Sequence, residues 1–292
     1  MTDKLLITGA GGQVGRALTK LASLHGFEPV PLTSRDLDVT DARAVRRAAE
    51  VYRPSAVVNA AAYTAVDKAE EEEKRARAVN ATGPANLASA FSSIPLLHYS
   101  TDYVFDGQGT RPYTEEDETA PLGRYGETKL AGERPVLRAG GTVMRTAWVY
   151  DETGPNFLRT MLRVGRQRGA LGVVDDQHGT PTHAADIAEA SLRILRRQVD
   201  EGRETAGLYH YTAASQTTWA GFAEAIFTAL RDQTGEEVGL TRITTADYPT
   251  PAARPAYSVL DGSKIERVFG VTRPDWRAPV AGTVEEALKD TA

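Results

Sequence analysis

The fold of this 292-residue chain is decided near its N-terminus, by the stretch Leu5-Leu6-Ile7-Thr8-Gly9-Ala10-Gly11-Gly12-Gln13-Val14-Gly15. Its apolar start predicts a buried strand, and a helical pattern follows the glycines. Glycines between a strand and a helix let the backbone approach a pyrophosphate, which the helix N-terminus attracts. The spacing G-x-x-G-x-x-G is weak by itself. Its place between strand and helix favours a dinucleotide site at Gly9, Gly12 and Gly15 over a turn that binds no ligand.

Outward from this turn, short apolar runs alternate with helical patterns. We predict strands at about 4–8, 28–32, 55–61, 95–100 and 142–147. This alternation indicates an α/β fold with a doubly wound parallel Rossmann sheet. Pro29 and Pro31 weaken the second strand, because each removes a hydrogen-bond donor. Thr40 and Thr182 are predicted to cap the helices that follow them, and Pro155 is predicted to open another.

The pattern changes after Trp148, and the rest of the chain predicts a smaller C-terminal lobe. We assign residues 1–150 and about 183–214 to the Rossmann domain, and about 151–182 and 215–292 to a substrate-binding lobe. Ligands of open α/β sheets bind beyond the carboxyl ends of the strands. The lobe is therefore expected to contribute substrate contacts there.

Composition excludes several classes of protein. A net charge of -5 and a pI near 5.7 argue against binding to nucleic acid, which needs a basic face. No apolar stretch is long enough for a membrane span, and the N-terminus lacks the features of a signal peptide. The absence of cysteine fits a reducing compartment, so a cytoplasmic location is expected. The histidines show no H-x-x-x-H spacing, and no metal site is predicted.

The turn after the second strand bears on the choice of cofactor. Dinucleotide sites that select NAD carry an acidic residue there, whereas this chain has Thr33-Ser34-Arg35. A guanidinium can pair with a 2′-phosphate, so Ser34 and Arg35 favour NADP(H), with NAD(H) as the alternative. The preference is open because Asp36 and Asp38 follow, and either could neutralise Arg35 instead.

A tyrosine and a lysine stand one helical turn apart in Tyr125-Gly126-Glu127-Thr128-Lys129. A cation near a phenol lowers the pKa of the phenol toward neutrality, which suits general acid catalysis. Tyr-x-x-x-Lys arises easily by chance, but this one follows a predicted strand that ends in Ser100-Thr101-Asp102. The hydroxyl of Ser100 or Thr101 at the carboxyl end of that strand could bind a substrate carbonyl oxygen. A hydroxyl bonded only to its own backbone is the alternative.

Taken together, the motifs resemble the extended short-chain dehydrogenase/reductase superfamily and, within it, the dTDP-4-dehydrorhamnose reductase family. The resemblance rests on stretches that span nearly the whole chain: 9–15, 59–67, 100–107, 125–132, 145–150, 176–182 and Arg254-Pro255. It implies NAD(P)H-dependent reduction of the 4-keto group of a dTDP-4-keto-6-deoxyhexose, most simply dTDP-4-dehydrorhamnose to dTDP-L-rhamnose.

The resemblance also implies roles for residues. Tyr125 would donate the proton, Lys129 would bind the cofactor ribose and tune Tyr125, and Thr101 would polarise the carbonyl. Asp102 and Trp148 would contact the sugar nucleotide, and Arg254 is a looser candidate for its phosphates. The cofactor would be lined, besides the residues already named, by Gly12, Gln13, Val14, Asp38, Val39, Ala61, Ala62, Tyr63 and Tyr99.

Two points stay open on the sequence. Some relatives form homodimers through magnesium bridged by glutamates, but Ala17 stands at one such position, so the metal is not carried over and a homodimer remains only an expectation. Other functions in reach of the fold are 4-ketoreduction of another dTDP-deoxysugar and the non-catalytic regulatory subunit of methionine adenosyltransferase. The presence of Thr101, Tyr125 and Lys129 favours an enzyme.

Overall fold

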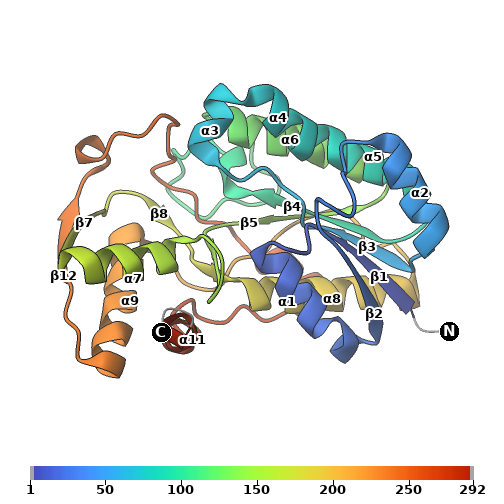
Figure 1. The fold of residues 1–292 in the computed structure, drawn as a ribbon. Helices are drawn as coiled ribbons and strands as arrows, with labels where there is room; N and C mark the ends of the chain where they lie inside the picture. The colour runs from blue at the N-terminus through green and yellow to red at the C-terminus, as the bar shows by residue number, and fades with distance from the viewer. Residues whose placement is uncertain (1–2, 290–292) are drawn as a thin grey trace.

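The computed structural model describes residues 3–289, and its centre is a parallel sheet of six strands (Figure 1). The strand order is β10-β5-β4-β3-β1-β2. The connection after β1 therefore leads to β2 on one side, whereas the connection after β3 leads to β4 on the other. The direction reverses between β1 and β3, and ligands of doubly wound sheets bind at such a switch point. The strands are β1 (Asp3–Thr8), β2 (Phe27–Leu32), β3 (Ala56–Asn59), β4 (Leu96–Thr101), β5 (Thr142–Thr146) and β10 (Leu208–His210).

Helices cover both faces of the sheet, so the predicted fold class is confirmed. One face carries α1 (Gln13–Leu21) and α8 (Ala184–Glu201), and the other carries α2 (Ala42–Tyr52), α5 (Gly83–Ala90) and α6 (Arg124–Arg138) (Figure 1). Short helices connect these elements: η1 (Ala22–His25), α3 (Val66–Glu71), α4 (Glu73–Arg77), the π-helix η2 (Ala78–Thr82) and η3 (Asp102–Val104).

A second apolar core lies to the left of the central sheet in Figure 1. It holds α7 (Phe157–Arg168), α9 (Trp219–Thr234), α11 (Val280–Lys289) and the paired strands β7 (Ala170–Val174) and β12 (Gly239–Ile243). The remaining elements are β6 (Val149–Tyr150), β8 (His178–Gly179), β9 (Thr182–His183), β11 (Thr217–Thr218), η4 (Thr245–Asp247) and α10 (Ser263–Phe269).

The division into two domains stays a prediction, and one element does not follow it. Helix α10 belongs to the stretch assigned to the lobe, yet Ile265, Val268 and Phe269 pack in the core that α1 and α8 share with the sheet. Among residues 3–289, no helix is both long and apolar enough to cross a membrane.

The two prolines of β2 are explained by the position of that strand. β2 stands at the edge of the sheet and pairs with β1, with Pro29 opposite Leu5 and Pro31 opposite Ile7. An edge strand has one side without a neighbour, and nitrogens two residues apart point to the same side. Both prolines can therefore turn their nitrogens outward without the loss of a ladder bond.

Three predicted helix starts are wrong. Asp41, not Thr40, caps α2, because its carboxylate accepts from the amides of Arg43 and Ala44. Asn156 caps α7 in place of the start predicted at Pro155. The Thr182 hydroxyl donates to the carbonyl of Thr180 and does not cap α8.

Candidate active site

The glycine turn presents backbone amides to the switch point of the sheet. Gly9 has a left-handed φ of +66°, and a side chain there would lie 2.5 Å from the backbone of Ala60. Gly12 is the N-cap residue of α1 and supplies no side-chain cap. The first amides of α1 therefore face outward beside the exposed Gly11 and Gly12, where the lack of side chains leaves room. These features fit a pyrophosphate at Gly9, Gly12 and Gly15.

Gln13 and Val14, the first residues of α1, make different contacts. The amide nitrogen of the Asn156 side chain donates to Gln13 Oε1 at 2.9 Å, so the turn is joined to the start of α7. Val14 packs against the core beneath α1. Gln13 thus lies between the predicted cofactor site and the second core.

The segment after β3 forms the other wall of the switch point. The amide of Ala61 donates to Asn59 Oδ1 at 3.2 Å, and Ala62 is exposed. Asn80 bonds both sides of the Tyr63 backbone, accepting from its nitrogen at 2.8 Å and donating to its carbonyl at 3.0 Å. Sequence reasoning missed Asn80, which is fully buried in the π-helix η2. Such π-bulges often occur at functional sites.

The loop after β2 leaves Arg35 available. Thr33 donates twice to Asp36, at 2.9 and 2.6 Å, and Thr40 donates twice to Asp38, at 2.9 and 2.7 Å. In the described part of the chain, neither carboxylate forms an ion pair with Arg35, which is exposed, as is Ser34. Val39, in contrast, is buried against Gly83.

The three predicted catalytic residues come from two adjacent elements. Thr101 ends β4, and Tyr125 and Lys129 lie one turn apart on α6. The Thr101 hydroxyl is hydrogen-bonded to Tyr125 and donates to Asp102 Oδ1 at 3.0 Å. The structure therefore brings the predicted hydroxyl, phenol and ammonium together at the carboxyl end of the sheet.

A residue from a distant helix holds the start of α6. Glu70 Oε1 accepts from the amide of Arg124 at 2.9 Å, whereas the N-cap residue Gly123 has no side chain to do so. Glu70 lies in a charge-rich stretch that looks in the sequence like an ordinary solvent-exposed helix face. No local signal links it to Tyr125.

The structure does not support the predicted lowering of the Tyr125 pKa by Lys129. Lys129 donates to the carbonyl of Tyr99, and burial raises the pKa of Tyr125 to about 12, a change that its hydrogen bond with Thr101 only partly opposes. Burial also lowers the pKa of Lys129 to about 8. The expectation of a lowered phenol pKa was wrong because it ignored the cost of burying the phenolate. Tyr125 is instead protonated at neutral pH, the form that a proton donor needs.

Tyr99 contributes to the site through its backbone. Its side chain is buried against α8, and its hydroxyl lies 2.6 Å from the Ser191 hydroxyl. Tyr99 therefore contacts the predicted catalytic residues through its backbone carbonyl, which accepts a hydrogen bond from the Lys129 ammonium.

Two predicted substrate residues carry buried polar atoms without partners among the described residues. Asp102 is 1% exposed, its Oδ2 has no hydrogen bond, and burial raises its pKa to about 6. Arg254 pairs through Nη2 with both oxygens of Asp67, at 2.9 and 2.8 Å, but its Nη1 has no partner. Unpaired buried polar atoms are costly, and polar groups of a ligand would satisfy them.

Trp148 is part of an aromatic stack. Its ring lies parallel to that of Trp219 at the start of α9, with centroids 3.5 Å apart and an interplanar angle of 8°. Gly179 lies against the Trp148 ring, where a side chain would not fit. Trp148 also has a left-handed φ of +45°, a conformation that costs about 1–3 kcal/mol and is often found at ligand sites.

Below α1, two acids and a histidine lie close together. Ligand atoms of Asp151, Glu152 and His183 lie within 4.8 Å of one another, and Ala17 lines the same cavity. Arg16 Nη2 lies 4.0 Å from Asp151, and burial raises the pKa of Asp151 to about 7. The guanidinium of Arg16 beside Asp151 opposes the binding of a divalent cation there.

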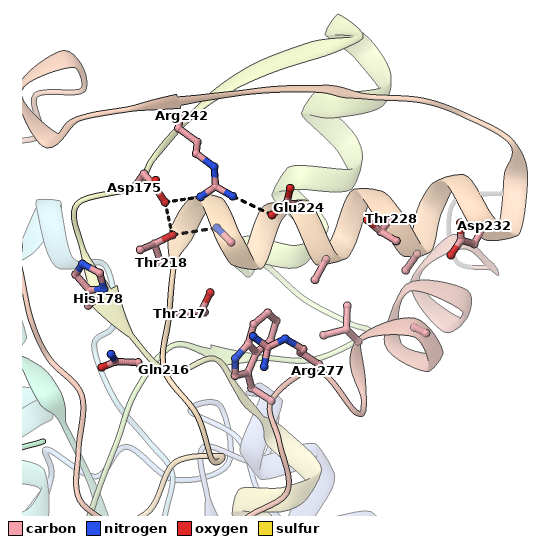
Figure 2. Close-up of a pocket in the computed structure, with 16 residues that line it drawn as sticks. Asp175, His178, Gln216, Thr217, Thr218, Glu224, Thr228, Asp232, Arg242 and Arg277 are labelled. Atoms are coloured by element: carbon pink, nitrogen blue, oxygen red, sulfur yellow. Dashed lines mark hydrogen bonds and ion pairs between the residues drawn. The ribbon is translucent and has the colours of Figure 1, made fainter.

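A cavity of about 640 Å³ lies beside α9, and none of the predicted site residues line it (Figure 2). Its charged groups are already paired, since Arg242 contacts Asp175 at 2.7 Å and Glu224 at 2.9 Å. The Thr218 hydroxyl also donates to Asp175. The candidate active site thus lies elsewhere, at the ends of β1, β3 and β4.

The fold and this site define a Rossmann-type oxidoreductase, with a dinucleotide turn after β1 and a tyrosine–lysine helix beside a strand-end hydroxyl. The family model described as RmlD substrate binding domain matches residues 3–289. The dTDP-4-dehydrorhamnose reductase of Burkholderia thailandensis is 43% identical over 98% of this chain and 99% of its own.

Solved structures agree. A dTDP-4-dehydrorhamnose reductase from Clostridium acetobutylicum superposes with a TM-score of 0.89 at 40% identity, covering 97% of this chain and 98% of its own. The Bacillus anthracis enzyme of the same name, in complex with NADP, superposes with a TM-score of 0.87 at 32% identity over 99% of this chain and all of its own. This chain belongs to the dTDP-4-dehydrorhamnose reductase family.

Proposed function

We propose that this protein reduces the 4-keto group of dTDP-4-dehydrorhamnose, with NADPH as the reductant. The observation that carries the proposal is the grouping of Thr101, Tyr125 and Lys129 at the carboxyl edge of the sheet. Membership of the family and the NADP complex of the Bacillus anthracis relative support it.

In the proposed reaction, the bound cofactor supplies a hydride to the carbonyl carbon. Tyr125 transfers its phenolic proton to the carbonyl oxygen, and the Thr101 hydroxyl donates a hydrogen bond to the same oxygen. Lys129, one helical turn away, would offer a positive charge as negative charge develops on the phenol. Gly9, Gly12 and Gly15 would hold the pyrophosphate, and Arg35 the 2′-phosphate.

The sugar nucleotide would lie between Asp102, Trp148 and Arg254. The unpaired Oδ2 of Asp102 and Nη1 of Arg254 support this assignment, because a hydroxylated sugar diphosphate offers donors to the first and acceptors to the second. Part of the charge on Arg254 is already offset by Asp67, so a phosphate would have to share the guanidinium with that carboxylate.

The proposal is tested by NADPH consumption with dTDP-4-keto-6-deoxyglucose, with and without a 3,5-epimerase. We expect turnover that depends on the epimerase and a product whose NMR spectrum is that of dTDP-L-rhamnose. Turnover without epimerase, or a C4 epimer as product, would instead indicate reduction of another dTDP-deoxysugar. No NADPH oxidation with any dTDP-4-keto sugar would reject the enzyme function. A homodimer and a cytoplasmic location stay predictions; light scattering in solution tests the first.

A further inference from the structure

A buried ion pair lies on the same face of α6 as the predicted catalytic residues. Glu133 follows Lys129 by four residues, as Lys129 follows Tyr125. The Arg145 guanidinium, from β5, donates to both Glu133 oxygens, at 2.9 and 2.8 Å. Both residues are buried, with 2% and 3% exposure.

The carboxylate of Glu133 is fixed by a third donor. The Ser100 hydroxyl donates to Glu133 Oε1 at 2.5 Å, and Ser100 directly precedes Thr101 on β4. On its far side, Arg145 faces His210 at 3.4 Å and lies over the ring of Phe105. The Glu133–Arg145 ion pair and the Ser100 hydroxyl therefore connect α6, β4 and β5. Two of these elements, α6 and β4, carry the predicted catalytic residues.

Stability alone is a weak reason for such a pair. Two charges lose their hydration on burial, and well-packed apolar side chains often stabilise a core as well as a buried ion pair does. The pair lies next to a third buried charge, however. Lys129 is 3% exposed, and the negative charge of Glu133 opposes the lowering of its pKa by burial.

Other groups near Lys129 do not supply a counter-charge. His98 from β4 is buried, and its pKa is well below the usual value because of burial and of the Lys129 charge, so it is neutral. Asp102 from η3 interacts with Tyr125, while Glu70 and Glu73 of α3 and α4 contact Arg124 at the start of α6. Helices η2 and α5, also packed on α6, contain no charged residue. On β5, Arg145 lies behind Glu133.

We propose that Glu133 is a positioning residue of the reductase site: its carboxylate, held by Ser100 and Arg145, keeps Lys129 as an ammonium ion at the Tyr99 carbonyl. This inference rests on the proposed function, in which the positive charge of Lys129 stabilises the phenolate that forms as Tyr125 gives up its proton. A charged Lys129 is lost as pH rises through its pKa. Removal of the Glu133 charge lowers that pKa, so activity should fail at a lower pH.

The test compares Glu133→Gln with Glu127→Gln, the same change at a less buried carboxylate on the same helix. We expect the alkaline fall in kcat/KM for NADPH-dependent reduction to move about one pH unit lower in Glu133→Gln and to stay in place in Glu127→Gln. Ser100→Ala removes a hydrogen bond and leaves the charge, so its alkaline fall should not move. Glu133→Asp, which keeps the charge, should restore the wild-type position.

A purely structural role for Glu133 predicts a different result. Activity would then drop by the same factor at every pH, and that outcome, or equal profiles for Glu133→Gln and Glu127→Gln, overturns the proposal. The pKa of Asp102 is raised to about 6, so its titration affects the acid side of the pH profile and leaves the alkaline fall in kcat/KM unchanged. Because Glu133→Gln leaves Arg145 buried without its partner, which destabilises the fold, Glu133→Gln/Arg145→Gln is measured as well. This double variant leaves no unpaired guanidinium, and its alkaline fall should also move to lower pH, by a smaller amount because the Arg145 charge is removed as well.

The pH dependence of NADPH binding, followed by cofactor fluorescence, separates this inference from the proposed function. If the wild type binds NADPH but reduces no dTDP-4-keto sugar, the function is wrong. The inference still stands in that case if the affinity of Glu133→Gln for NADPH declines at a lower pH than that of the wild type. It fails if the two binding profiles coincide.

Discussion

Tyr125 is a phenol that stays protonated over the whole physiological pH range, since the usual pKa of about 10 already lies above that range and burial raises it to about 12. It reaches the site from the first turn of α6, and the Thr101 hydroxyl is its hydrogen-bond partner. A change that keeps the ring removes only the hydroxyl and its hydrogen bond with Thr101, and leaves the packing of the ring in place.

Tyr125→Phe should therefore lower kcat by roughly 10²–10⁴-fold, the usual contribution of a general acid. The ring still packs against Tyr103, with which it makes an edge contact at 5.6 Å, so the dissociation constant for NADPH should hardly change. Steady-state kinetics and fluorescence titration give the two values. A variant with wild-type kcat would show that the proton comes from another group.

Arg35 is the residue on which the cofactor preference depends. Its two acidic neighbours are bonded to Thr33 and Thr40, so the guanidinium is free to meet a 2′-phosphate. Arg35→Ala should raise the KM for NADPH by roughly 10- to 100-fold and leave the KM for NADH unchanged, since one charge-assisted contact contributes about 1.5–3 kcal/mol. Arg46→Ala, an exposed arginine on α2, controls for the loss of one positive charge. An unchanged NADPH-to-NADH ratio would remove Arg35 from the site.

At the scale of elements, α9 supports the aromatic stack that is proposed to meet the sugar nucleotide. Its first residue, Trp219, lies on Trp148, and its N-cap Thr218 accepts from the amide of Gly221 at 3.0 Å. The same hydroxyl donates to Asp175. The position of the stack therefore depends on how well the start of α9 is held.

Thr218→Ala should lower the free energy of unfolding by about 1 kcal/mol, the typical value of a lost N-cap. It should also raise the KM for the sugar nucleotide more than it lowers kcat, because Trp219 loses its anchor while Tyr125 does not. Urea denaturation and kinetics measure the two effects. Thr228→Ala, an exposed threonine in the middle of the same helix, should change neither. Equal effects from both variants would contradict the role of the cap.

For the whole molecule, the structure argues against a structural divalent cation at the group formed by Asp151, Glu152 and His183. Arg16 supplies positive charge beside Asp151. Treatment with EDTA should therefore leave both the activity and the molecular mass in solution unchanged. Loss of either, with recovery after Mg²⁺ is added, would show that a metal binds despite Ala17 and Arg16.

Much of the fold could be predicted from local sequence patterns. The strands were predicted within a few residues because apolar runs and glycine turns reflect backbone preferences of neighbouring residues, and β2 was found despite its prolines. Helix starts were less reliable, since Thr40 and Asp41 are both plausible caps and only the backbone path decides between them.

The sequence by itself determined the dinucleotide turn at Gly9 to Gly15, the tyrosine–lysine pair and the order of elements that brings them together, because each depends on residues close in the chain. Only the tertiary structure decided the ionisation of the pair. Burial raises the pKa of Tyr125, and Lys129 meets the Tyr99 carbonyl. It also brought in Asn80, Glu70 and the Glu133–Arg145 pair, whose partners lie far apart in sequence. The pKa values and these contacts depend on burial and on residues brought together by folding, so they cannot be predicted from the sequence around each residue.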